Sequence, residues 1–440
     1  MNLLDKGNFL IKSGLVLLLI PFFFACQDPD ELGVKVSSDN QNVTVSDTTI
    51  TLPLSTILID SLRTNQFASL LVGNMQDSVT GTVACTGYTQ YSPGTGTFPG
   101  DTLEYVSANI KLKIIDARTT TNMLNGHIDI HESNDTLYNQ VVYLADREIE
   151  YNPTPIAQID YNINIDQDSI ITIPLNDLGQ DLFDQLVKYN TDTLFKDSLD
   201  RSLLYYQPLV LNTTSVNTGL MALSLSNDSS AIFIEMKSPT SDSTYYYKFN
   251  FVSRGHFTHI ERDRAGSKLA SLVDEYIDEY GNGYAYGSMV DGVYAKVDMK
   301  PLKEFLSANE NIIINNSRIS MTITDYSSEF IVPFNSIRYY YIKKGRINGP
   351  IGSSRLAAYT STILSNSSYS SSSADFLSMV YQDDTPNYSG EVTLFTQIYA
   401  DDALGIDMEE MVVLSSTPTS IRQTIFTGAE VTVFYTLVNK

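Results

Sequence analysis

The chain has few of the residues that crosslink proteins, stack on sugars or bind nucleic acids. Its 440 residues include two cysteines, four histidines and no tryptophan. Two cysteines allow one disulfide at most, so the fold must rest on hydrophobic cores, for which an apolar fraction of 42% is sufficient. Acidic residues number 51 against 28 basic ones, and the net charge of −23 repels nucleic acid. Composition therefore argues against a disulfide scaffold and against DNA or RNA as a partner.

The chain also lacks the short motifs that carry catalysis or cofactor binding. It contains no Gly-x-Ser-x-Gly, no phosphate-binding glycine loop, no His-Glu-x-x-His and no Cys-x-x-Cys. We therefore expect a protein that is not an enzyme and holds no cofactor. A hydrolase acting on polysaccharide or peptide stays open as the alternative, because only the fold brings the two carboxylates of a glycosidase together.

A long apolar run occurs at the N-terminus. Lys6 and Lys12 precede it as a basic start, the run itself is Leu15–Phe24, and the small residue Ala25 stands directly before Cys26. This order is typical of a secretory signal, and the run is about half the roughly 20 residues that a membrane-spanning helix needs. A cysteine after the small residue predicts lipoprotein processing, in which fatty acyl chains such as palmitate are attached to Cys26. Two or three such chains hold a protein firmly on a membrane.

The mature protein is expected to begin at Cys26, after removal of the signal peptide, residues 1–25. Residues 26–47 are rich in Asp, Ser and Asn, which is typical of a flexible acidic tether. The acidic piece Gln27–Glu31 resembles the surface-export signal of Bacteroidetes lipoproteins, with an ordinary polar tether as the alternative. The predicted location is the outer membrane, facing the cell exterior. Acylation of Cys26 leaves Cys85 alone, and its strand-like surroundings predict a buried side chain.

Short runs rich in Thr, Tyr, Ile and Val alternate with turn-rich pieces along the mature chain, as expected for β-strands. Many short strands with regular turns indicate a mainly β fold of two β-sandwich or jelly-roll-like domains. The first domain is predicted over residues 48–255 and the second over 256–440. The charged segment 253–266 interrupts the strand pattern and is the expected connection between them.

Three segments predict short amphipathic helices. Residues 176–189 and 267–280 each place apolar side chains on one helical face, and residues 300–308 carry a proline in the first turn. We expect these helices to cover sheet edges or barrel ends.

Five local features together resemble a known family. They are the acidic stretch with a Leu-Gly pair, Asp28–Gly33; the piece Leu71–Asp77; the strands Asn109–Ile114 and the one ending in His131-Glu132; Tyr245–Lys248 before His256–Gly266; and Gly287–Pro301 before a Leu-rich helix and Ile314–Ser317. The chain resembles an uncharacterised family of Bacteroidetes outer-membrane lipoproteins (domain of unknown function 4270) over most of its mature length. The resemblance implies an outer-membrane location and a β-rich fold. It implies no activity and no catalytic residues.

Two groups of histidines are candidate metal sites. In a strand, His127, Asp129 and His131 share one face, and two imidazoles with a carboxylate suit zinc. Strand positions four apart lie roughly 13 Å from each other, which favours a solvated polar face over one shared ion. His256 and His259 fall in the charged segment, where a plain connection is the alternative to a metal or ligand site.

Triplets of Asp, then Ser or Thr, then a small or apolar residue are O-glycosylation acceptors in Bacteroidetes. Polar, turn-like surroundings favour Thr102, Thr136 and Thr193 as the acceptors in this chain.

Together these patterns predict a lipid-anchored, surface-exposed envelope lipoprotein. Its expected role is non-enzymatic: binding a ligand or partner, or contributing structurally to the envelope. The expected partners are the membrane, through the N-terminal lipid, and other envelope proteins or glycans.

Overall fold

The computed structural model describes most of the chain after the tether. The described residues are 43–94, 102–119, 123–164, 170–191, 207–213, 219–226, 228–275, 277–309, 312–324, 333–334, 336–343, 346–350, 360–365, 368–372, 410–415 and 421–438. Nearly all of them belong to one compact unit, Val45–Thr436. The predicted signal peptide, Cys26 and the tether as far as residue 42 lie outside the described residues, whereas residues 43–47, also predicted as tether, begin a strand instead.

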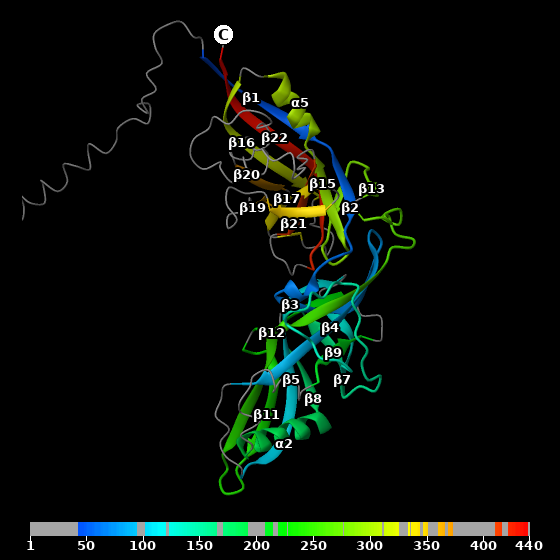
Figure 1. Ribbon diagram of the computed structural model, residues 1–440, viewed down its shortest axis with the longest axis vertical. Helices are drawn as coiled ribbons and strands as arrows, with labels where there is room; N and C mark the ends of the chain where they lie inside the picture. The colour runs from blue at the N-terminus through cyan, green and yellow to red at the C-terminus, as the bar shows by residue number, and fades with distance from the viewer. Residues whose placement is uncertain are drawn as a thin grey trace, which may run out of the picture. The chain divides into compact units, whose positions relative to one another are not determined.

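The fold is mainly β, which confirms the predicted class (Figure 1). A 10-stranded sheet holds the strands from the middle of the chain. These strands are β3 (Ser69–Asp77), β4 (Gly81–Pro93), β5 (Glu104–Thr119), β6 (Met123–Glu132), β7 (Ala157–Asn164), β8 (Ile170–Leu175), β9 (Leu209–Asn212), β10 (Gly219–Ser224), β11 (Ala231–Lys237) and β12 (Thr244–Asp263).

Strand pairing in this sheet closes on itself. The order runs β12–β11–β5–β10–β3–β4, and β12 also pairs with β4. The closure depends on the length of β12, because residues before Phe251 pair with β11 while residues as far as Asp263 pair with β4. Strands β9, β6 and β7 continue the sheet beyond β4.

The 12-stranded sheet combines the two ends of the described chain. Its strands are β1 (Val43–Leu52), β2 (Leu54–Leu58), β13 (Glu279–Tyr280), β14 (Ala285–Gly287), β15 (Val293–Asp298), β16 (Ile312–Ile323), β17 (Ser336–Lys343), β18 (Arg346–Pro350), β19 (Thr360–Ser365), β20 (Ser368–Ser372), β21 (Glu410–Ser415) and β22 (Thr424–Val438). Strand β1 therefore lies beside β22, and β2 beside β15, although long stretches of sequence separate them.

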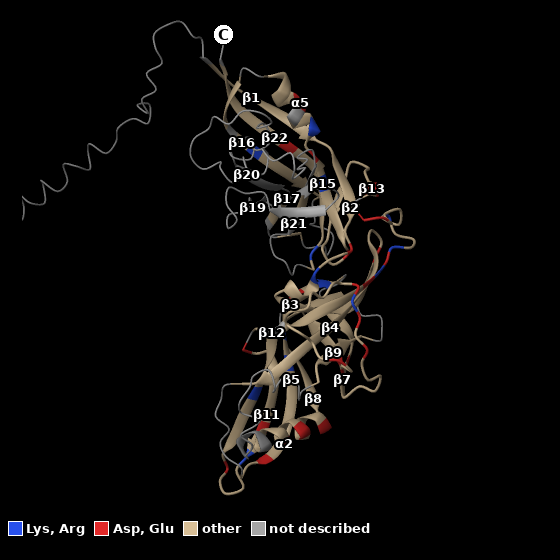
Figure 2. Ribbon diagram, viewed as in Figure 1, with Lys and Arg blue, Asp and Glu red and all other residues tan. Residues whose placement is uncertain are grey.

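Two of the three predicted helices form. Helix α2 (Asp177–Thr191) packs Leu182 and Leu186 into the core of the 10-stranded sheet and exposes its acidic residues, seen in red in Figure 2. Helix α5 (Lys300–Ala308) begins with proline in its first turn, as expected, and a short 3-10 turn, η2, covers Thr64–Gln66.

The prediction of a helix over residues 267–280 was wrong. The described residues of this segment form turns followed by β13. The backbone nitrogens of Lys268 and Leu269 donate to the carbonyls of Ser78 and Val79, which ties the segment to the β3–β4 turn. Tertiary hydrogen bonds have thus replaced the i→i−4 pattern, although Leu269 is buried as the amphipathic pattern required.

The expected connection at 253–266 also differs from the structure. Residues as far as Asp263 belong to β12, which runs through the predicted boundary at 255 and 256. A register shift between Phe251 and His256 disturbs the two-residue alternation, which is why the sequence here does not read as a strand. Division into two independently folding domains stays a prediction.

Strands β3 and β10 are buried on both faces. Leu70, Val72, Met221 and Leu223 pack into the core of the 10-stranded sheet. The alternate residues, including Leu71, join a second core with residues of the 12-stranded sheet, among them Ile57, Tyr294 and Val412. Burial on both faces explains why these strands read as continuous apolar runs.

Candidate functional site

Both predicted histidine groups contribute to one face of the 10-stranded sheet. Alternate residues of a strand point to the same face. His127, Asp129 and His131 therefore share the face of β6 opposite Ile128 and Ile130, both of which are core residues. His259 reaches the same face from β12, because it pairs with Thr86 of β4.

A row of polar residues crosses five strands on this face. His259 of β12 pairs with Thr86 of β4, and the Thr86 hydroxyl donates to Asn212 Oδ1 of β9 at 3.3 Å. Asn212 pairs with Asp129 of β6, which pairs with Gln158 of β7. We call these five residues the polar row. Only the strand pairing brings them together, since they come from distant parts of the sequence.

His127 lies beside the polar row between two carboxylates. Its Nδ1 is 2.6 Å from Asp160 Oδ1, and its Nε2 is 3.0 Å from Asp129 Oδ1. Asp129 is buried while Asp160 is exposed. Hydrogen bonding to Asp160, with the bond and charge of Asp129, raises the pKa of His127 against the opposing effect of burial. We call this arrangement the histidine clamp, because it joins β6 to β7.

His131 and His256 are bound to backbone carbonyls, whereas His259 Nε2 lies 3.5 Å from Glu261 Oε1. His131 Nδ1 lies 2.8 Å from the carbonyl oxygen of Asn152, and its ring contacts Tyr151 with centroids 4.8 Å apart. His256 Nε2 lies 2.8 Å from the carbonyl oxygen of Phe67. His256 is on the opposite face of β12 from His259, so those two residues do not form the pair that the sequence suggested.

A segment between β6 and β7 covers the aromatic part of this face. Tyr143 stacks on Phe257, which stacks on Tyr88, with centroids 4.5 and 4.4 Å apart. The Tyr88 hydroxyl donates to the Ile149 carbonyl, and Gln90 Nε2 donates to the Leu137 carbonyl. The three stacked rings and these bonds fix the covering segment on β4 and β12.

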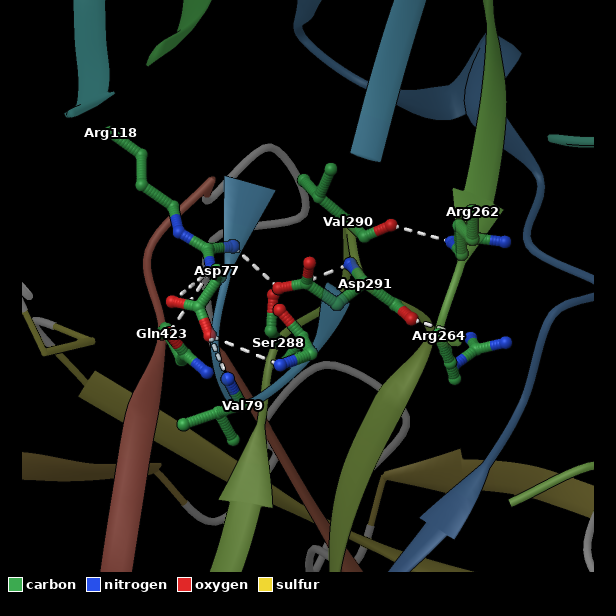
Figure 3. A network of polar contacts seen from close by, with 10 residues as sticks. Asp77, Val79, Arg118, Arg262, Arg264, Ser288, Val290, Asp291 and Gln423 are labelled. Carbon is green, nitrogen blue, oxygen red and sulfur yellow. Dashed lines mark hydrogen bonds and ion pairs between the residues drawn. The ribbon is translucent and has the colours of Figure 1, made fainter. Parts of the chain in front are cut away.

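A buried ion network joins the two sheets, and the sequence did not reveal it (Figure 3). Arg118, at the end of β5, donates from Nη1 to Asp291 Oδ2 at 2.5 Å and from Nη2 to Gln423 Oε1 at 3.1 Å. Its Nη2 also lies 3.4 Å from Asp77 Oδ2. The side chains of Arg118 and Asp291 are only 6% and 1% exposed.

Charge neutralisation permits this burial. Burial alone raises the pKa of Asp291, but the charge of Arg118 and the hydrogen bonds of Ser288, Arg118 and Thr80 together outweigh it, so that the pKa of Asp291 lies below its ordinary value. The neighbouring carboxylate of Asp77 also caps the β3–β4 turn, accepting bonds from the nitrogens of Val79 and Thr80. In the sequence, the sign of this network is a single arginine at the end of an apolar strand. Its partners lie far away along the chain, so the sequence alone does not identify them.

Arg262, in β12, and Arg264, just after it, extend the network. Arg262 Nε donates to the Val290 carbonyl at 2.6 Å, and Arg264 Nη2 donates to the Asp291 carbonyl at 2.7 Å. Both guanidinium groups also contact Asp60 Oδ1, at 3.1 and 2.8 Å. The turn that follows Ser288 is therefore held by Arg118 of β5, Arg262 of β12 and Arg264 just after β12, as Figure 3 shows.

The thiol of Cys85 is buried in the second core. Burial raises the pKa of the Cys85 thiol to about 12, so the thiolate needed for nucleophilic attack does not form near neutral pH. Among the described residues, no group of three His, Cys, Asp or Glu side chains has a geometry that could hold a metal ion.

The glycosylation candidates differ in accessibility. Thr102 is exposed in a turn before β5, and Thr136 is half-buried in the segment that follows β6. Thr193, like Cys26, lies outside the described residues.

Comparison with known proteins gives no relative: no family model, no curated protein and no solved structure matches the chain significantly. The resemblance to the lipoprotein family therefore stays a prediction from the sequence. Within the described part of the chain, no helix is long and apolar enough to cross a membrane.

Proposed function

We propose that this protein is an outer-membrane lipoprotein, anchored through Cys26 and facing the cell exterior, that acts without catalysis. The anchor is supported by the N-terminal order of basic residues, apolar run, Ala25 and Cys26. The acidic residues that follow Cys26 support export to the surface.

A binding or structural role is supported by what the ionisable side chains do. His127 is engaged by two carboxylates, and His131 and His256 bind backbone carbonyls. Arg118 and Asp291 form a buried ion pair, in which each charge neutralises the other. The observation that carries the proposal is that the polar row runs across a sheet face, with its members spaced by whole strands, rather than converging as a nucleophile and its base do. The partners we propose are envelope proteins or glycans.

Replacing Cys26 tests the anchor. Cys26→Ala is expected to abolish acyl labelling and to leave the protein unprocessed or released from the membrane. Cys85→Ala is the matched control, because Cys85 is buried and its removal leaves processing unchanged. The anchor is refuted if Cys26→Ala keeps the acylated mass and still partitions into detergent.

Two measurements test the other parts of the proposal. External protease on intact cells is expected to digest the wild-type protein, and full protection would place it on the inner side of the membrane. Turnover of any member of a broad panel of polysaccharides and peptides by the purified protein would overturn the non-enzymatic role in favour of the hydrolase.

A further inference from the structure

The turn between β13 and β14 has the sequence Gly281-Asn282-Gly283. All three residues are exposed, and Gly283 has a φ of +81°. A side chain built on Gly283 would meet nothing within 4 Å, so the space around its backbone is open. The Asn282 amide nitrogen donates to the hydroxyl of the partly buried Tyr280 at 3.0 Å.

We propose that Asn282 is a site of spontaneous deamidation. The backbone nitrogen of Gly283 attacks Cγ of Asn282, a carbon–nitrogen bond forms, and the bond from Cγ to Nδ2 breaks with loss of ammonia. Water then opens the cyclic imide at either carbonyl, leaving aspartate or isoaspartate. Glycine favours the attack because it has no side chain to shield its nitrogen. The reaction needs no enzyme and no oxidant, and its co-reactant is solvent water.

The chain contains an internal control with the same dipeptide. Asn125-Gly126 lies within β6, where Asn125 pairs with Asn162 and Gly126 with Tyr161 of β7. Cyclisation requires the backbone to rotate out of the extended conformation, which the strand pairing opposes. Asn125 must therefore wait for local opening of the sheet, while the exposed turn at Asn282 need not.

Conversion would change the turn electrostatically as well as covalently. Each event replaces a neutral amide with a carboxylate and adds one negative charge to an already acidic protein. The Tyr280 hydroxyl, which accepts a hydrogen bond from the amide, would then donate one to the carboxylate. Isoaspartate would in addition lengthen the backbone of the turn.

Peptide mapping by mass spectrometry tests the proposal on the full-length protein. The native protein and a sample unfolded in denaturant are incubated in parallel in warm, mildly alkaline buffer. In the native sample we expect the Asn282 peptide to convert at least about tenfold faster than the Asn125 peptide, because only the latter requires local opening. In denaturant the two rates should become similar.

Two variants complete the test. Asn282→Gln should abolish conversion at this turn, since a glutamine side chain closes the ring far more slowly, and Asn125→Gln should leave the rate at Asn282 unchanged. Equal native rates at the two sites, or a native Asn282 peptide that keeps its amide while the denatured one converts, would overturn the proposal.

Discussion

An imidazole donates hydrogen bonds to two carboxylates only when both of its ring nitrogens are protonated. His127 lies between two carboxylates, those of Asp160 and Asp129. Hydrogen bonding to Asp160 and to Asp129 raises the pKa of His127 in the folded protein. A raised folded-state pKa stabilises the protein fully below the unfolded value of about 6.5, and the stabilisation is lost as the pH rises through the folded value.

The histidine clamp therefore predicts a pH dependence for one side chain. The difference in urea midpoint between wild type and His127→Gln should be largest below about pH 6.5 and should shrink as the pH rises through the folded-state pKa. Chemical denaturation at a series of pH values measures it. A difference that stays constant across the series would show that His127 titrates as it does in the unfolded chain.

Removing Arg118 is expected to destabilise the protein more than removing His127, because it leaves Asp291 charged and buried. Breaking a buried ion pair from one side typically costs about 3 to 5 kcal/mol, so Arg118→Ala should lower the free energy of unfolding by that order. The matched control is Lys300→Ala, whose pair with Glu304 is exposed on α5. Exposed pairs contribute less than about 1 kcal/mol. Urea denaturation of wild type, Arg118→Ala and Lys300→Ala measures the two losses of unfolding free energy.

A double variant separates charge from packing at the same place. Replacing Arg118 and Asp291 together with apolar residues removes both buried charges, and it should cost less than Arg118→Ala alone. If the double variant is less stable than Arg118→Ala, lost packing rather than an unpaired charge explains the destabilisation.

At the scale of single elements, the β3–β4 turn depends on Gly81. Its φ of +94° disfavours side chains, and a Cβ there would lie 2.1 Å from the carbonyl oxygen of Asp263 in β12. Gly81→Ala should therefore cost more than the roughly 1 to 2 kcal/mol expected from the left-handed backbone alone. Gly266→Ala is the control, because Gly266 has a φ of +75° but open space around it. Equal losses in thermal denaturation would show that the contact with β12 is unimportant.

Strand β12 makes a second prediction at this scale. If residues 257–263 form a strand paired with β4, their amides should resist hydrogen exchange, while those of residues 270–275 should exchange quickly. Exchange measured by mass spectrometry on peptides from the native protein tests this contrast. Rapid exchange in both segments would favour the charged connection that the sequence alone suggested.

At the scale of the whole unit, the two sheets share a core and an ion network. Leu71 and Leu220 of one sheet pack in the same buried cluster as Ile57 and Tyr294 of the other. Separating the sheets would expose this apolar surface together with Arg118 and Asp291. We therefore expect one cooperative thermal transition, with equal calorimetric and van't Hoff enthalpies. Two resolved transitions would support independent domains instead.

Local patterns were sufficient for much of the architecture. Period-two alternation identified the β class and strands such as β5, β6 and the first part of β12, because each has one face in a core. The apolar stripe and proline of α5 placed that helix correctly. The lipoprotein processing proposed at Cys26 also rests on a linear segment, and it stays a prediction.

The tertiary structure decided what depends on remote partners. The turns that replace the helix over residues 267–280 follow from carbonyls on the β3–β4 turn. His127 gained its second carboxylate from β7, and Arg118 gained Asp291 and Gln423 from the other sheet. A sequence shows which residues recur at a given spacing, but ion pairs, strand register and burial on both faces arise only when distant segments meet.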